Sequence, residues 1–174
     1  DIEAIRKASE LLDIKGKVLP VTLDKAELHA VLENGETIKG ETNIDIPKHD
    51  GNMKIKKVYL EPEAHIYEET ATAIRDADIV IIGPGDSYTS IIPNLLVQGV
   101  PEALQASKGK KIVICNLMTK WGETHGFQAS DMVKELLKYS GLKKFDYAIC
   151  STSEMNPRLV QAYEEEKKYP MLCD

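Results

Sequence analysis

The sequence lacks the features of membrane, disulfide-rich and nucleic-acid-binding proteins. No stretch approaches the roughly 18 consecutive apolar residues of a membrane-spanning helix, and its start lacks a basic-then-apolar signal pattern. The chain has only three cysteines, at a spacing that fits neither a disulfide scaffold nor a zinc ribbon. Its formal net charge of −6 offers no basic surface for a phosphate backbone. We therefore expect a cytoplasmic protein with reduced thiols that binds neither membrane nor nucleic acid.

The apolar content is that of one folded domain. The 174 residues are 43% hydrophobic and 29% charged, which is enough to bury a core. We treat residues 1–174 as a single α/β domain. The chain begins inside a predicted helix, Asp1–Asp13, and stops in a short strand-like stretch, Tyr169–Cys173. These ends predict a fragment that is truncated at both termini.

Residues 17–60 have the pattern of a small antiparallel β region. Apolar residues recur at about every second position, and the turn signals Asp24-Lys25 and Asn34-Gly35 separate the runs. Strands are predicted at Lys17–Leu23, Glu27–Leu32, Thr37–Ile44 and Ile55–Leu60. A short region of this kind before regular βα repeats is typical of an insertion or of an edge on a larger sheet.

Residues 67–174 alternate strands with helices. The run Ile79-Val80-Ile81-Ile82 is apolar on both faces, as a central parallel strand is. The other strands are predicted at Lys111–Cys115, Asp146–Cys150 and Tyr169–Cys173, and the helices at Tyr67–Asp76, Asn94–Ser107, Gln128–Tyr139 and Pro157–Lys168. This order predicts an α/β fold with a doubly wound, Rossmann-like parallel sheet. In such sheets ligands bind outside the carboxyl ends of the strands, so the loops there carry the candidate site.

The first candidate loop is Gly83-Pro84-Gly85, followed by Asp86-Ser87-Tyr88-Thr89-Ser90. Its glycines allow the backbone to approach a ligand, and the hydroxyl groups with the following helix N-terminus are suited to phosphate oxygens. A tight turn with a serine or threonine cap is the simpler alternative. The loop has neither the Gly-Lys-Ser/Thr ending of a Walker A motif nor the third glycine of the dinucleotide fingerprint, which disfavours an ordinary P-loop ATPase.

The second candidate loop spans Asn116–Thr124 and gathers many polar groups. Its candidate ligand contacts are Asn116, Met118, Thr119, Gly122, Glu123 and Thr124. Glu123 is either a helix cap or a ligand contact. Trp121 is either a hydrophobic plug or a platform for a flat ring, and His125 is more typical of a solvated loop residue than of a general base.

The remaining polar residues have structural interpretations. In the loop Ser151–Asn156, Asn156 caps the helix that begins at Pro157. Each cysteine ends a predicted strand, so we interpret all three as inert core thiols. His29, His49 and His65 have no metal-ligand spacing.

Together the two loops resemble the bacterial gluconeogenesis factor family, which is related to 2-phospho-L-lactate transferase. The motifs that carry the resemblance are Gly83–Leu96, Cys115–Thr119 and Gly122-Glu123-Thr124, and it extends to Leu11–Leu23, Gly40–Ile44 and Asn156–Tyr163. It therefore covers nearly the whole chain. The sequence departs from the family at Asp86-Ser87, where Ser-Leu is common, and in lacking the family's glycine-rich first strand.

The resemblance implies a regulator of carbon metabolism and cell shape that binds UDP-sugars without a required cofactor. The Gly83–Ser90 loop would hold the diphosphate, the Asn116–Thr124 loop would contact nucleotide or sugar, and Tyr163 is a further candidate contact. The alternative is a transferase that moves a phospholactyl group onto a deazaflavin alcohol. Asp86 and Glu123 would then hold magnesium, because this ion favours one or two carboxylates plus substrate phosphates. A homodimer is the assembly we expect, because two-fold pairs are the commonest.

Overall fold

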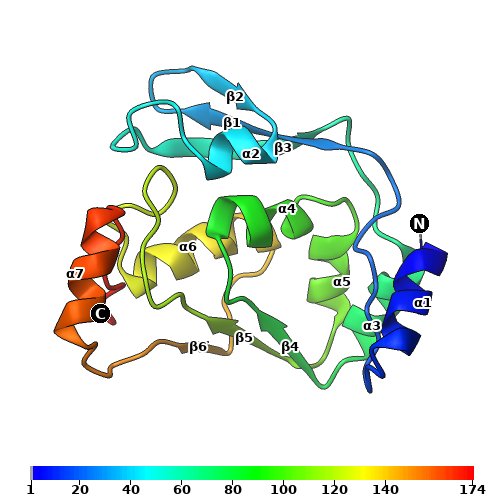
Figure 1. The fold of residues 1–174 in the computed structure, drawn as a ribbon. Helices are drawn as coiled ribbons and strands as arrows, with labels where there is room; N and C mark the ends of the chain where they lie inside the picture. The colour runs from blue at the N-terminus through cyan, green and yellow to red at the C-terminus, as the bar shows by residue number, and fades with distance from the viewer. Residues whose placement is uncertain (1) are drawn as a thin grey trace.

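The computed structural model describes residues 2–174. Two three-stranded sheets enclose a layer of helices, as Figure 1 shows. The antiparallel sheet has the order β2-β1-β3 and consists of β1 (Glu27–Leu32), β2 (Thr37–Lys39) and β3 (Ile55–Glu61). The parallel sheet has the order β4-β5-β6 and consists of β4 (Ile79–Ile82), β5 (Lys110–Ile114) and β6 (Tyr147–Ile149). The expected combination of a parallel α/β sheet with a small antiparallel region is confirmed.

The helices follow the predicted alternation. Between the sheets lie α4 (Ile92–Leu95), α5 (Val100–Ala106) and α6 (Ala129–Ser140). The others are α1 (Ile2–Leu11), α2 (Glu41–Asp45), α3 (Glu68–Asp76) and α7 (Pro157–Glu165). The Asn156 side chain accepts a hydrogen bond from the N–H of Arg158, which is the predicted cap of α7. Asp1, the first residue of the first predicted helix, lies outside the described residues. No helix within residues 2–174 combines the length and apolarity that crossing a membrane requires.

One hydrophobic core joins the two sheets through the helix layer. Leu32 of β1, Ile92 of α4, Leu136 of α6 and Val113 of β5 are fully buried members of it. The helices therefore cover the face of the parallel sheet that carries Val113. The opposite face of that sheet is exposed at Ile79, Ile81, Tyr147 and Ile149.

The predicted hairpin Lys17–Leu23/Glu27–Leu32 is wrong in its first half. Thr22 forms only an isolated bridge with Ile66, and the carbonyl of Val21 accepts from the N–H of Tyr67. Pro20 has no N–H to donate to a ladder. This segment therefore pairs with the chain before α3 and not with β1.

Two further element predictions are wrong because a glycine interrupts each of them. The strand expected over Thr37–Ile44 stops at Lys39, because Gly40 has a φ of 84° and the chain turns into α2. The helix expected over Asn94–Ser107 is split into α4 and α5 at Gly99, which has a φ of 96°. Such φ values are readily accessible only to glycine. A π-helical turn, η1 (Ser87–Ile91), precedes α4.

The C-terminal stretch Tyr169–Cys173 forms no regular strand. It runs antiparallel to the second candidate loop, with an isolated bridge between Pro170 and Met118. The N–H of Thr119 donates to the carbonyl of Tyr169 at 2.7 Å, and the N–H of Met171 donates to that of Leu117 at 2.9 Å. Pro170 lacks a donor, which keeps the pairing short.

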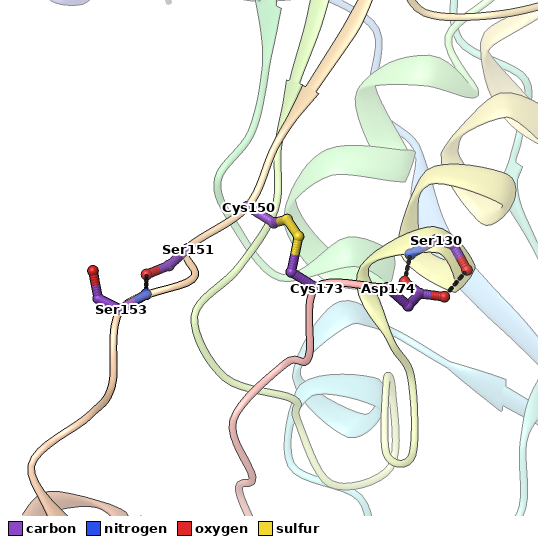
Figure 2. The surroundings of a disulfide bond; sticks show 6 residues. All are labelled: Ser130, Cys150, Ser151, Ser153, Cys173 and Asp174. Atoms are coloured by element: carbon purple, nitrogen blue, oxygen red, sulfur yellow. Dashed lines mark hydrogen bonds between the residues drawn. A yellow bond between two sulfur atoms is a disulfide. The ribbon is translucent and has the colours of Figure 1, made fainter.

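The expectation of three reduced core thiols is also wrong. Cys150 and Cys173 form a disulfide with a Cα–Cα distance of 5.9 Å (Figure 2). Cys115 is a buried free thiol. The pairing of the C-terminal stretch beside the end of β6 brings the two cysteines together. Beyond the disulfide, the carboxylate of Asp174 accepts from the N–H and hydroxyl of Ser130, at the start of α6.

A peptide map tests this cysteine arrangement. In a digest prepared without reductant, the peptides that carry Cys150 and Cys173 are expected to be linked, while the peptide that carries Cys115 is free. Mass spectrometry before and after reduction measures both. If free thiols are alkylated at lysis, recovery of Cys150 and Cys173 as unlinked, alkylated residues would contradict the disulfide.

Candidate functional site

The two candidate loops meet at the carboxyl ends of adjacent parallel strands. The Gly83–Ser90 loop follows β4 and the Asn116–Thr124 loop follows β5, and the two strands pair directly. The side chain of Asn116 joins the loops with two hydrogen bonds. It accepts from the N–H of Gly85 at 3.0 Å and donates to the carbonyl of Gly85 at 2.9 Å. Both polar groups of Gly85 are thus engaged, and Asn116 fixes the shape of the first loop.

Glu123 makes a second connection between the loops. Its carboxylate is fully buried and accepts from the N–H of Tyr88 and from the hydroxyl of Thr89, each at 3.0 Å. Burial raises the pKa of the Glu123 carboxyl, against the opposing effect of Lys120 and the Tyr88 N–H. Glu123 was expected to be either a helix cap or a ligand contact, and its contacts support neither role. The carboxylate anchors η1.

Lys120 lies at the centre of three carboxylates from three parts of the chain. Its ammonium pairs with Asp45 of α2, with Asp86 at 2.6 Å and with Glu123 at 3.2 Å. Burial alone would lower the pKa of Lys120, but the hydrogen bonds to Asp45 and Asp86 and the charge of Glu123 outweigh it and raise that pKa. Lys120 therefore carries a permanent positive charge beside the first loop.

The three carboxylates form a donor set for a divalent cation. Oxygen atoms of Asp45, Asp86 and Glu123 lie within 4.8 Å of one another. Carboxylate oxygens are the ligands that magnesium and calcium prefer. The residue types fit such an ion, provided that the Lys120 ammonium moves out of the centre.

Trp121 and His125 pack against the protein instead of facing an open site. The Trp121 ring has the ammonium of Lys167 at 4.3 Å from its centroid and the His125 ring edge-on at 4.6 Å. A Cβ built on Gly51 would lie 2.2 Å from the Trp121 ring, so that glycine makes room for the indole. These contacts agree with the interpretation of Trp121 as a plug.

The structure brings most of the predicted site residues together, and many of them already make hydrogen bonds or packing contacts within the protein. Thr119 accepts from the N–H of Tyr169, and Thr124 accepts from the N–H of Lys120. Gly122 has a φ of 81° and packs against Pro47. The buried hydroxyl of Ser87 has no hydrogen-bond partner within residues 2–174, and Ser90 is exposed. The predicted set around both loops is Gly83, Gly85, Ser87, Tyr88, Thr89, Ser90, Asn116, Met118, Thr119, Gly122, Glu123 and Thr124.

Tyr163 stands apart from this group. It lies on α7, is 39% exposed, and its side chain makes no hydrogen bond to either loop in the described part of the chain. Its role as a ligand contact stays a prediction.

Sequence reasoning missed Lys120 and Asp45. Lys120 was visible as the one cation inside the two candidate loops, and Asp86, the carboxylate that departs from the family pattern, was visible in the other loop, 34 residues away. Asp45 gave no such signal, because it is 75 residues away in the chain from Lys120. Only the position of α2 over the loops brings them together.

Two hollows of ligand size flank the joined loops. One, of about 450 Å³, lies along β4 and is lined by Gly83, Pro84 and Ser90 together with apolar side chains. The other, also about 450 Å³, lies between the Ser151–Met155 segment and the C-terminal stretch, and includes Leu117. Both are within the range of small-molecule sites.

Comparison with known proteins places the chain among relatives of one kind. Residues 2–174 match the family model described as 2-phospho-L-lactate transferase CofD. A protein named "Putative gluconeogenesis factor" from Thermoanaerobacterium thermosulfurigenes is 44% identical over 99% of this chain and 53% of its own length. The "Gluconeogenesis factor" of Bacillus subtilis is 38% identical over 98% of this chain and 53% of its own.

A solved structure shares the fold. The crystal structure of a UPF0052 family member from Bacillus halodurans matches with a TM-score of 0.91 at 36% identity, over 99% of this chain and 55% of that one. The chain thus spans about half the length of the curated relatives it matches.

Proposed function

The chain belongs to the 2-phospho-L-lactate transferase CofD family, and on this basis we propose that the protein binds a nucleotide sugar, such as a UDP-sugar, as a regulator of the gluconeogenesis factor type. Relatives of that name are 35–46% identical to it. The role we assign is control of carbon metabolism and cell shape. Cytoplasmic location and a homodimeric state are parts of the same proposal.

The observation that carries this proposal is the joining of two loops at neighbouring strand ends. Asn116 and Glu123 hold the Gly83–Ser90 loop against the Asn116–Thr124 loop through hydrogen bonds to Gly85, Tyr88 and Thr89. In open α/β sheets this edge is where nucleotide ligands bind. A fixed loop also binds without an ordering cost, which favours affinity.

The division of roles follows from which groups are free. Thr89, Asn116 and Glu123 are used to position the loops. The groups assigned to the diphosphate are the hydroxyls of Ser87 and Ser90, which have no side-chain partner in the described chain, and the ammonium of Lys120, which must first give up one of its three carboxylates. The nucleotide or sugar is assigned to the Asn116–Thr124 loop, and Tyr163 of α7 is the outermost contact.

The alternative function is that of a magnesium-dependent phospholactyl transferase. The observation in its favour is the carboxylate group Asp45, Asp86 and Glu123. In that case Asp86 and Glu123 would hold the ion beside substrate phosphates, and the ion would supply charge stabilisation to the transferred group.

Calorimetric titration of UDP-N-acetylglucosamine into the full-length protein, with and without magnesium, separates the two functions. We expect saturable binding in both conditions and no new product. Binding that requires magnesium, or no binding at all, would favour the transferase.

The Asp86→Ala variant sharpens this distinction. We expect its affinity for the UDP-sugar to be unchanged or improved, because a carboxylate beside a phosphate is repulsive. A tenfold loss, about 1.4 kcal/mol, would contradict the regulator proposal.

A further inference from the structure

The charge around Lys120 is unfavourable for an anionic ligand as it stands. Three carboxylates and one ammonium leave a formal charge of −2 beside the loop proposed to hold a diphosphate. A lysine ammonium has three N–H donors. All three face carboxylates, so an incoming phosphate oxygen can pair with Lys120 only by replacing one of them.

The three carboxylates differ in how firmly they are held. Glu123 is fully buried and carries two further hydrogen bonds, from Tyr88 and Thr89. Asp86 is 39% exposed and accepts a side-chain hydrogen bond only from Lys120 among residues 2–174, but it belongs to the loop proposed to hold the phosphate. Asp45 is 36% exposed, belongs to the five-residue helix α2 and makes no other side-chain hydrogen bond among residues 2–174. Of the two partly exposed carboxylates, Asp45 is the one on a separate element, so it can leave Lys120 without a shift of the phosphate-binding loop.

Building on the proposed function, we propose that Asp45 occupies Lys120 in place of ligand, and that a phosphate oxygen of the nucleotide displaces it. Lys120 is then the residue that gives the site its specificity for phosphate, since its ammonium acts as a point charge for phosphate oxygens. It continues to neutralise Asp86, which explains how a loop with an added carboxylate accepts an anion. The exchange also removes the ion pair that ties α2 to the second loop, while the buried side chain of Ile44 keeps α2 in the core, so the expected effect is a local loosening of α2.

Four variants of the full-length protein test the exchange by calorimetric titration with UDP-N-acetylglucosamine. Asp45→Asn is expected to tighten binding by about fivefold, because the competing charge is removed. Glu41→Gln, the matched control in the same helix with the same change of charge, should leave affinity within about twofold. Lys120→Met should weaken binding by about tenfold or more, and Lys120→Arg should retain most of it.

A second measurement reports on α2 directly. Hydrogen exchange of the amides of residues 41–46 should become faster when the nucleotide binds to the wild-type protein. In Asp45→Asn it should be fast already and insensitive to ligand. If Asp45 had only a structural role, the Asp45→Asn variant would instead bind the nucleotide more weakly.

Unchanged or weakened binding in Asp45→Asn, with wild-type binding intact, overturns the exchange and leaves the proposed function standing. If the wild-type protein binds no UDP-sugar, the proposed function fails. Titration of the same variants with inorganic pyrophosphate then decides the exchange separately. Pyrophosphate that binds Asp45→Asn no better than wild type overturns it.

Discussion

Replacing Glu123 with alanine is expected to lower the free energy of unfolding by about 3 to 5 kcal/mol, because removal of one partner from a buried ion pair leaves the rest uncompensated. The truncated side chain would leave the N–H of Tyr88 and the hydroxyl of Thr89 without acceptors. Lys120 would also lose its most deeply buried partner. Chemical denaturation of the wild-type and variant proteins measures the difference.

The controls for Glu123→Ala are a conservative variant and a remote one. Glu123→Gln keeps an acceptor oxygen and should cost clearly less than alanine. Glu154→Ala removes an exposed loop carboxylate and should change stability by no more than about 0.5 kcal/mol. A loss below about 1 kcal/mol for Glu123→Ala would mean that the carboxylate does not anchor the loops.

Gly83→Ala is expected to destabilise the protein by about 3 kcal/mol, through backbone strain and a steric clash together. Gly83 has a φ of 85°, and a Cβ there would lie 2.8 Å from the carbonyl oxygen of Ile114. That oxygen belongs to β5 and cannot rotate away. The strand end would have to shift, and the first loop with it.

Gly85→Ala is the matched control two residues away. Its Cβ would meet Ile91 and Ser90 at 3.5 Å, which is ordinary contact. The variant should therefore fold with near-wild-type stability. Equal denaturation midpoints for the two variants would contradict the strain assigned to Gly83, whereas loss of UDP-sugar binding in folded Gly85→Ala would support close approach of a ligand.

The parallel half of the fold could be predicted from the sequence because its signals are local. The apolar run Ile79–Ile82 and the glycines after it specify a strand and a tight loop without reference to distant residues. The same holds for the Asn116–Thr124 loop, where the density of polar side chains after a strand indicated a candidate site. The central, doubly buried position expected for the strand Ile79–Ile82 is wrong within the described residues, because β4 lies at the edge of the sheet and Ile79 and Ile81 are exposed. Both loops lie together as expected for neighbouring parallel strands.

The antiparallel half was predicted less well because its pairings depend on distant residues. The alternation in Lys17–Leu23 suits a strand, but the partner it takes is the chain at Ile66 and not the neighbouring β1. The alternation through Ile44 likewise extends past Gly40, where the backbone leaves the sheet. The periodicity of a segment identifies which of its residues form an apolar face, but it does not identify the segment with which it pairs.

The parts of the site that sequence did not predict are contacts between distant segments. Asp45 reaches Lys120 only because α2 rests over η1, and Cys150 meets Cys173 only because the C-terminal stretch returns to the second loop. No rule of sequence spacing predicts either of these two contacts. The roles of Thr89, Asn116 and Glu123 in holding the loops, as opposed to contacting a ligand, also require the fold to be known.

The bare face of the parallel sheet has a practical consequence for handling this span of sequence. Ile79, Ile81, Tyr147 and Ile149 present large apolar side chains to water, and β4 and β6 are the outermost strands of the described sheet. Open strand edges beside an apolar surface are templates for self-association. Residues 2–174 produced in isolation are therefore expected to self-associate through this face, and a surface laid over those four side chains should suppress that association.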